Sequence, residues 1–80
     1  MTARASCNYL DTLIGHNTRE IRETRGLAIN ESAAALDISS AELKLIEGGI
    51  QGATADVIIK AARRFRIQPS LLARPTALRR

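Results

Sequence analysis

Aromatic residues are nearly absent from this sequence of 80 residues, which has one Tyr, one Phe and no Trp. The apolar share of 45% is mostly Ala, Leu and Ile, and these stand beside many Glu and Arg residues. Ala, Leu, Glu and Arg favour helices, whereas β-branched and aromatic residues favour strands. The composition therefore excludes a β-sandwich or barrel and predicts an all-α fold, and the length allows one small, compact domain.

Cysteine and long apolar runs are also lacking. The single cysteine, Cys7, has no partner for an internal disulfide, and no Cys/His cluster suits a structural zinc. No apolar run approaches the roughly 20 residues that a membrane span needs, and no signal-peptide pattern opens the chain. We therefore expect a cytoplasmic protein in a reducing compartment, with no metal, no other cofactor and no membrane segment.

Catalytic constellations are missing as well. His16 and Cys7 each stand alone, and the sequence has no Ser/His/Asp set and no paired carboxylates. The glycines around Gly48 and Gly52 match no phosphate-cradling motif. The sequence therefore predicts a protein that is not an enzyme.

Charge is unevenly distributed along the chain, whose net charge is +4. Residues 28–59 carry one base and five acids, whereas residues 60–80 carry seven bases and no acid. A basic segment of this kind suits phosphates or an acidic protein surface. The middle of the chain is therefore acidic and its end is basic.

Apolar spacing and turn residues predict five short helices. The first runs from about Asp11 or His16 to Arg25, and its start is uncertain because Gly15 weakens the early turns. The second lies within residues 27–36, and Asp37 suits the tight turn that follows it. The third begins after a cap at Ser39 or Ser40 and ends at Gly48, with Leu43 and Ile46 facing inward.

The fourth and fifth helices follow a glycine-rich loop. Thr54 is a cap for the fourth helix, whose expected buried stripe consists of Ile58, Ala61, Ala62 and Phe65. Pro69 suits the first position of a short fifth helix that contains Leu71 and Leu72. Five helices with a short turn between the second and third indicate a helix-turn-helix.

The run TREIRETRGLAINESAAALDISSAELKLIEGGIQGATADVIIKAARRFRIQPSLL resembles the XRE type of helix-turn-helix, the family of phage lambda Cro and repressor. The family pattern is matched without a gap by Arg19, Ile21, Arg22, Gly26, Leu27, Ala33, Leu36, Ile38, Ser39, Leu43, Ile46, Glu47, Gly49, Ile58, Ala62, Phe65, Ile67, Leu71 and Leu72. The resemblance implies a compact five-helix domain over residues 14–73. Residues 1–13 are then an extension that joins the first helix in part or not at all, and residues 74–80 are a basic tail.

The resemblance also implies a DNA-reading surface. In the family the third helix enters the major groove, and the positions that read base edges correspond here to Ser39, Ser40, Ala41, Lys44 and Leu45. Of these, only Lys44 belongs to the residue types that make bidentate base contacts. Ser39 and Ser40 are equally explained as helix caps, and Leu45 as a surface leucine for a protein partner.

Further departures from the family make this surface less suited to binding DNA. The family's Gln at the start of the second helix, a phosphate contact, is Ile29 here, and its Ser or Thr cap is Ala28. Capping is then expected to shift to Asn30, which is also a candidate DNA contact. The outward Glu42 would repel phosphates, and phosphate neutralisation supplies most DNA affinity.

Two further features are predicted outside this face: an ion pair, which the resemblance implies, and a basic cluster, which the sequence shows. Arg22 and Glu47 occupy positions that often form a partly buried ion pair in the family; the alternative is two independent surface charges. A basic cluster for phosphates or an acidic partner is formed by Arg63, Arg64, Arg66, Arg74, Arg79 and Arg80. The alternative for this cluster is an ordinary solvated helix face.

Two functions are therefore predicted. The first is a small transcriptional regulator, such as a repressor, that binds double-stranded operator DNA as a homodimer. The dimer contact would come from Tyr9, Leu10, Leu13 and Leu78. The second is an XRE-fold module that binds a regulatory protein, as an anti-regulator or antitoxin-like partner, with weak or no sequence-specific DNA binding.

Overall fold

The computed structural model describes residues 9–75, and it contains four α-helices and one 3-10 helix in that range. These elements are α1 (Tyr9–Thr24), α2 (Ile29–Leu36), α3 (Ser40–Glu47), α4 (Ala55–Phe65) and the 3-10 helix η1 (Pro69–Ala73). The all-α prediction is confirmed for residues 9–75, and the predicted short fifth helix is a 3-10 helix rather than an α-helix. No helix within residues 9–75 has the length and apolar character that crossing a membrane requires.

Capping residues mark the starts of α3 and α4. The Ser39 hydroxyl accepts a hydrogen bond from the Glu42 backbone N–H at 3.0 Å, and the Thr54 hydroxyl accepts one from Val57 at 3.2 Å. Each bond satisfies one of the backbone donors that a helix start leaves unpaired. Ser39 is therefore the cap of α3, and Ser40 is its first residue.

Two other helix ends differ from the predictions. Helix α1 begins at Tyr9, earlier than expected, so residues 9–13 belong to it. Helix α2 begins at Ile29 after Ala28, and no side chain caps it. The predicted shift of capping to Asn30 is wrong because Asn30 already lies inside the helix.

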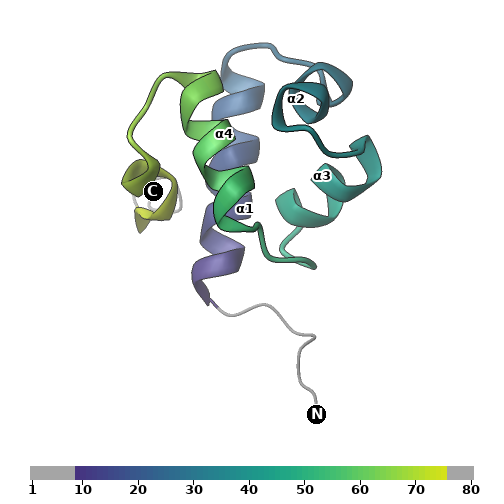
Figure 1. The fold of residues 1–80 in the computed structure, drawn as a ribbon. Helices are drawn as coiled ribbons and strands as arrows, with labels where there is room; N and C mark the ends of the chain where they lie inside the picture. Colours follow the sequence, from purple (N-terminus) through teal and green to yellow (C-terminus); the bar gives the residue numbers. More distant parts are fainter. Residues whose placement is uncertain (1–8, 76–80) are drawn as a thin grey trace.

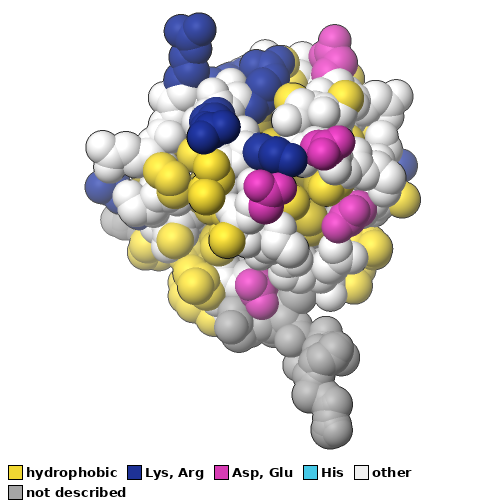
Figure 2. Space-filling view, in the orientation of Figure 1, with side chains coloured by type: hydrophobic (Ala, Val, Ile, Leu, Met, Phe, Trp, Pro, Cys, Tyr) yellow, Lys and Arg dark blue, Asp and Glu magenta, His cyan; other side chains and the backbone are white. Residues whose placement is uncertain are grey.

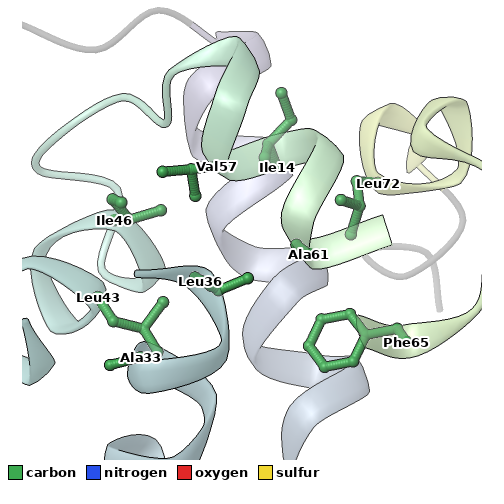
Figure 3. Packing of buried hydrophobic residues seen from close by; sticks show 9 residues of the cluster. All are labelled: Ile14, Ala33, Leu36, Leu43, Ile46, Val57, Ala61, Phe65 and Leu72. Carbon is green, nitrogen blue, oxygen red and sulfur yellow. The ribbon is translucent and has the colours of Figure 1, made fainter. Parts of the chain in front are cut away.

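The core is built from all five elements. Figure 3 shows the side chains of this cluster, which are Ile14, Ala33, Leu36, Leu43, Ile46, Val57, Ala61, Phe65 and Leu72. Val57, rather than the predicted Ile58, is buried in the first turn of α4, and Ile58 is half-buried against the cluster. Val57, Ile58 and Ile59 are three consecutive β-branched residues, so the sequence alone does not show which of them is buried. The angle at which α4 packs against the core decides that it is Val57.

Helix α1 runs through the centre of the arrangement. Helix α3 and η1 pack against different sides of α1, whereas α4 contacts both α2 and η1 (Figure 1). Helices α2 and α3 therefore lie on one side of α1, and η1 lies on the other side (Figure 1).

Candidate nucleic-acid interface

A three-residue turn joins α2 to α3. Asp37 ends α2 in the left-handed conformation, with φ 63° and ψ 41°, and its N–H donates to the carbonyl oxygens of Ala33 and Ala34. Asp tolerates this conformation better than most non-glycine residues do. The turn brings the two helices together, and the Ser40 hydroxyl of α3 donates to the Asn30 side-chain oxygen of α2 at 2.8 Å.

Helix α3 presents a small outward face. Leu43 and Ile46 are buried, as predicted, whereas Ala41, Lys44 and Leu45 are exposed. Among these exposed side chains only Lys44 carries a charge. Glu42 is half-buried, and its carboxylate accepts a hydrogen bond from the Gln51 amide at 3.1 Å.

A surface depression lies where α3 meets α1 and the start of α2. Its lining residues are Arg19, Arg22, Ile29, Lys44, Glu47 and Gly48. Arg19 was not among the predicted site residues, although it stands three positions before Arg22 and so shares its face of α1. We call this hollow the α1–α3 depression. It brings cations from two helices to the edge of the outward face of α3.

The charges in the α1–α3 depression are partly compensated within the protein. Arg19 Nε lies 3.1 Å from an oxygen of Glu23, one turn later on α1, and both side chains are more than half exposed. Exposed pairs of this kind are worth at most about 1 kcal/mol. Arg19 can therefore exchange Glu23 for a phosphate at little cost.

Arg22 and Glu47 form a bidentate ion pair between α1 and α3. Arg22 Nε donates to one Glu47 carboxylate oxygen at 2.8 Å, and Nη2 donates to the other at 3.0 Å. A third donor, Nη1, reaches the Leu27 carbonyl oxygen at 2.8 Å. The hydrogen bond to Glu47 raises the pKa of Arg22 against the opposing effect of burial. The pair therefore fixes α3 relative to α1 and to the segment that enters α2.

Solved structures provide an independent comparison. The clp gene regulator ClgR from C. glutamicum has a TM-score of 0.74 at 18% identity, over 81% of this chain and 84% of that chain. The restriction-modification controller protein C.AhdI from Aeromonas hydrophila has a TM-score of 0.71 at 24% identity, over 76% and 92%. The hypothetical transcription factor NHTF from Neisseria has a TM-score of 0.76 at 19% identity, over 92% and 88%.

The fold is an XRE-like helix-turn-helix. No protein-family model matches the sequence, and no curated protein does. In this helix-turn-helix, α2 and α3 are the two helices of the motif, and Ala41, Lys44 and Leu45 lie on the outward face of its second helix.

The described arginines of the predicted basic cluster lie on α4, at the end of α4 and beside η1. Arg63 and Arg64 line a depression between α2 and α4, whereas Arg74 lines another one beside η1. Arg66 ends α4 in the left-handed conformation, with φ 58°. Arg79 and Arg80 lie outside the described residues. Among the described residues, Arg63 and Arg64 therefore line one depression and Arg74 lines another.

The residues predicted for a dimer contact differ in their solvent exposure. Tyr9 and Leu10 are 68% and 49% exposed at the start of α1, but Leu13 is only 2% exposed. Leu13 is therefore part of the core of this domain and not a surface contact. Leu78 lies outside the described residues.

Proposed function

We propose that the protein is a DNA-binding transcriptional regulator that inserts α3 into the major groove of its operator. The observation that carries this proposal is the α1–α3 depression, where Arg19 of α1 lies beside Lys44 of the outward face of the second helix of the motif. The fold supports it, since the three similar structures described above are, by name, a gene regulator, a controller protein and a transcription factor. This role is regulatory rather than enzymatic.

The residues of this face divide into two roles. Lys44 is the base-reading cation, because Lys makes specific contacts to guanine in the major groove. Arg19 binds a phosphate beside the groove, which positions α3 without reading sequence. Asn30 supports this reading face, since its side-chain oxygen is held by Ser40 while its amide nitrogen has no partner within residues 9–75.

The regulator acts as a homodimer and as a repressor in this proposal. Helix-turn-helix dimers read two half-sites about one helical turn apart. Occupation of an operator by such a dimer would by itself exclude other proteins from that DNA. Tyr9 and Leu10 provide exposed apolar side chains for the dimer contact. The working compartment is the cytoplasm, where DNA is accessible.

Selection from a random duplex library tests the proposal. We expect a two-half-site sequence to be enriched, and Lys44→Ala to lose preference at one base pair of each half-site. Arg74→Ala is the matched control, because it removes the same charge beside η1, away from α3. Failure to enrich any sequence would overturn DNA reading.

A protein-interaction module is the second candidate, and specific exposed side chains favour it. Leu45 is 40% exposed on α3 and Ile50 is 66% exposed in the loop that follows. Exposed apolar residues beside few cations suit a protein partner better than DNA. Under this alternative, Leu45→Glu abolishes capture of a partner from the host lysate, because an unpaired charge is costly to bury. Retained capture by Leu45→Glu would contradict it.

A further inference from the structure

A second basic depression lies between the end of α2 and the outer side of α4. Its lining residues are Ala35 from α2 and Lys60, Arg63 and Arg64 from α4. We call it the α2–α4 depression. It is separate from the α1–α3 depression, because Ile29 at the first turn of α2 lines one and Ala35 at the last turn lines the other.

The cations of the α2–α4 depression are not equivalent. Lys60 lies 3.0 Å from Asp56 and 3.5 Å from Asp37, and these carboxylates raise its pKa. Arg63 and Arg64 are exposed, and neither forms an ion pair or side-chain hydrogen bond with any residue in the described range 9–75. A position near the carboxyl end of α4 is favourable for both through the helix dipole. The dipole supplies no hydrogen-bond acceptor, so the guanidinium donors of both residues have no acceptor among residues 9–75.

Apolar surface adjoins these arginines. Ala35 is exposed on α2, and Ile59 is 45% exposed on α4. Alanine side chains let another backbone approach α2 closely. Arginine beside small apolar surface is typical of protein–protein contacts, in which guanidinium groups pair with carboxylates while apolar atoms leave water.

Acidic side chains on the same face argue against nucleic acid as its ligand. Asp37 and Asp56 have side chains that are 86% and 71% exposed on either side of Lys60. Figure 2 shows basic side chains over the carboxyl-terminal half of α4, with acidic side chains beside them. A phosphate backbone is uniformly negative and would be repelled by these carboxylates, whereas a peptide can place its acidic groups at the arginines alone.

We propose that the α2–α4 depression binds an acidic peptide segment of a partner protein, with Arg63 and Arg64 holding two of its carboxylates over Ala35. This function goes beyond DNA recognition and does not depend on it. The α1–α3 depression is at the other end of α2, so both surfaces can be occupied at once.

Two substitutions on one helix test the geometry. Ala35→Glu places a carboxylate inside the depression, where it competes with the peptide for the arginines. Ala34→Glu adds the same charge to the neighbouring exposed position, which does not line the depression. Binding of a fluorescein-labelled peptide that carries two glutamates among neutral residues is measured with the full chain by anisotropy at low salt. We expect Ala35→Glu to weaken binding at least about fivefold, the effect of losing one good exposed pair, and Ala34→Glu to change it less than about twofold.

A double substitution tests the arginines themselves. Arg63→Gln with Arg64→Gln should weaken binding of the two-glutamate peptide more than Lys44→Gln with Arg74→Gln, although each pair removes the same charge. Thermal unfolding followed by circular dichroism checks that each variant is folded. Equal weakening by both pairs would overturn the proposal, because binding would then follow net charge alone. The proposal is also overturned if random duplex DNA binding, rather than peptide binding, depends on Arg63 and Arg64.

Discussion

Gly15 of α1 packs directly against the backbone of Ile46 in α3. A Cβ atom at position 15 would overlap the Ile46 carbonyl oxygen, which cannot move without displacing the last turn of α3. The absence of a side chain therefore sets how closely the second helix of the motif approaches α1. The same approach brings Glu47 to Arg22.

Gly15→Ala is expected to destabilise the domain. Helix propensity alone would favour alanine by about 1 kcal/mol. Overpacking a tight contact costs about 1–3 kcal/mol, and here the obstacle is backbone, so packing should outweigh propensity. Chemical denaturation measures the free energy of unfolding. An increase in that free energy for Gly15→Ala would show that α1 and α3 do not approach as described.

Removal of Arg22 is expected to be far more costly than removal of Arg19. The Glu47 side chain is only 5% exposed, so Arg22→Met leaves a buried carboxylate without its partner, at a cost of about 3–5 kcal/mol. Arg19→Met is the matched control on the same helix, and loss of its exposed pair with Glu23 should cost about 0.5 kcal/mol. Adding Glu47→Leu to Arg22→Met should recover much of the loss, which a double-mutant cycle measures.

The pH dependence of the Arg22 contribution follows from the sign of its pKa shift. The folded pKa is raised above the ordinary arginine value, so the stabilisation is fully present below that ordinary value and is lost only as pH rises through the folded pKa. The difference in unfolding free energy between wild type and Arg22→Gln should therefore stay constant on moderate alkalinisation from neutral pH. A steady fall over that range would contradict this assignment.

Asn17 is expected to hold η1 on the domain. Its buried amide nitrogen donates to the carbonyl oxygens of Leu72 and Arg74, each at 2.7 Å. Asn17→Ala leaves two carbonyl groups without this donor and should lower stability by about 1–3 kcal/mol. Hydrogen exchange should quicken in η1 more than in α3. Unchanged hydrogen exchange in η1 would show that the packing of Leu72 alone holds η1 on the domain.

Salt dependence should separate the cations that contact DNA from those that do not. Each phosphate contact contributes about 0.9 to the slope of log affinity against log salt. We expect Arg19→Ala to reduce that slope by about this amount, and Arg74→Ala to leave it unchanged because η1 and α3 pack on different sides of α1. A reduction with Arg74→Ala and none with Arg19→Ala would move the phosphate contact to the carboxyl-terminal arginines.

The sequence by itself determined the features that depend on neighbouring residues. Asp37 at the turn and the caps at Ser39 and Thr54 are local, because each acts within one helical turn of its own position. Apolar spacing likewise placed Leu43 and Ile46 inward. Family resemblance, rather than spacing, predicted the pair of Arg22 and Glu47, which are 25 positions apart.

Tertiary structure decided what depends on how the helices approach one another. From the sequence, Gly15 only weakens a helix, whereas in the structure it allows α3 to pack closely against α1. Asn17 is an ordinary polar residue in the sequence, but in the structure it donates to carbonyl groups 55 and 57 positions away. The choice of Val57 over Ile58 depends on the packing angle of α4. Arg19 joins Lys44 only because α1 and α3 are in contact. Such relations join residues far apart in the chain, and local propensity contains no information about them.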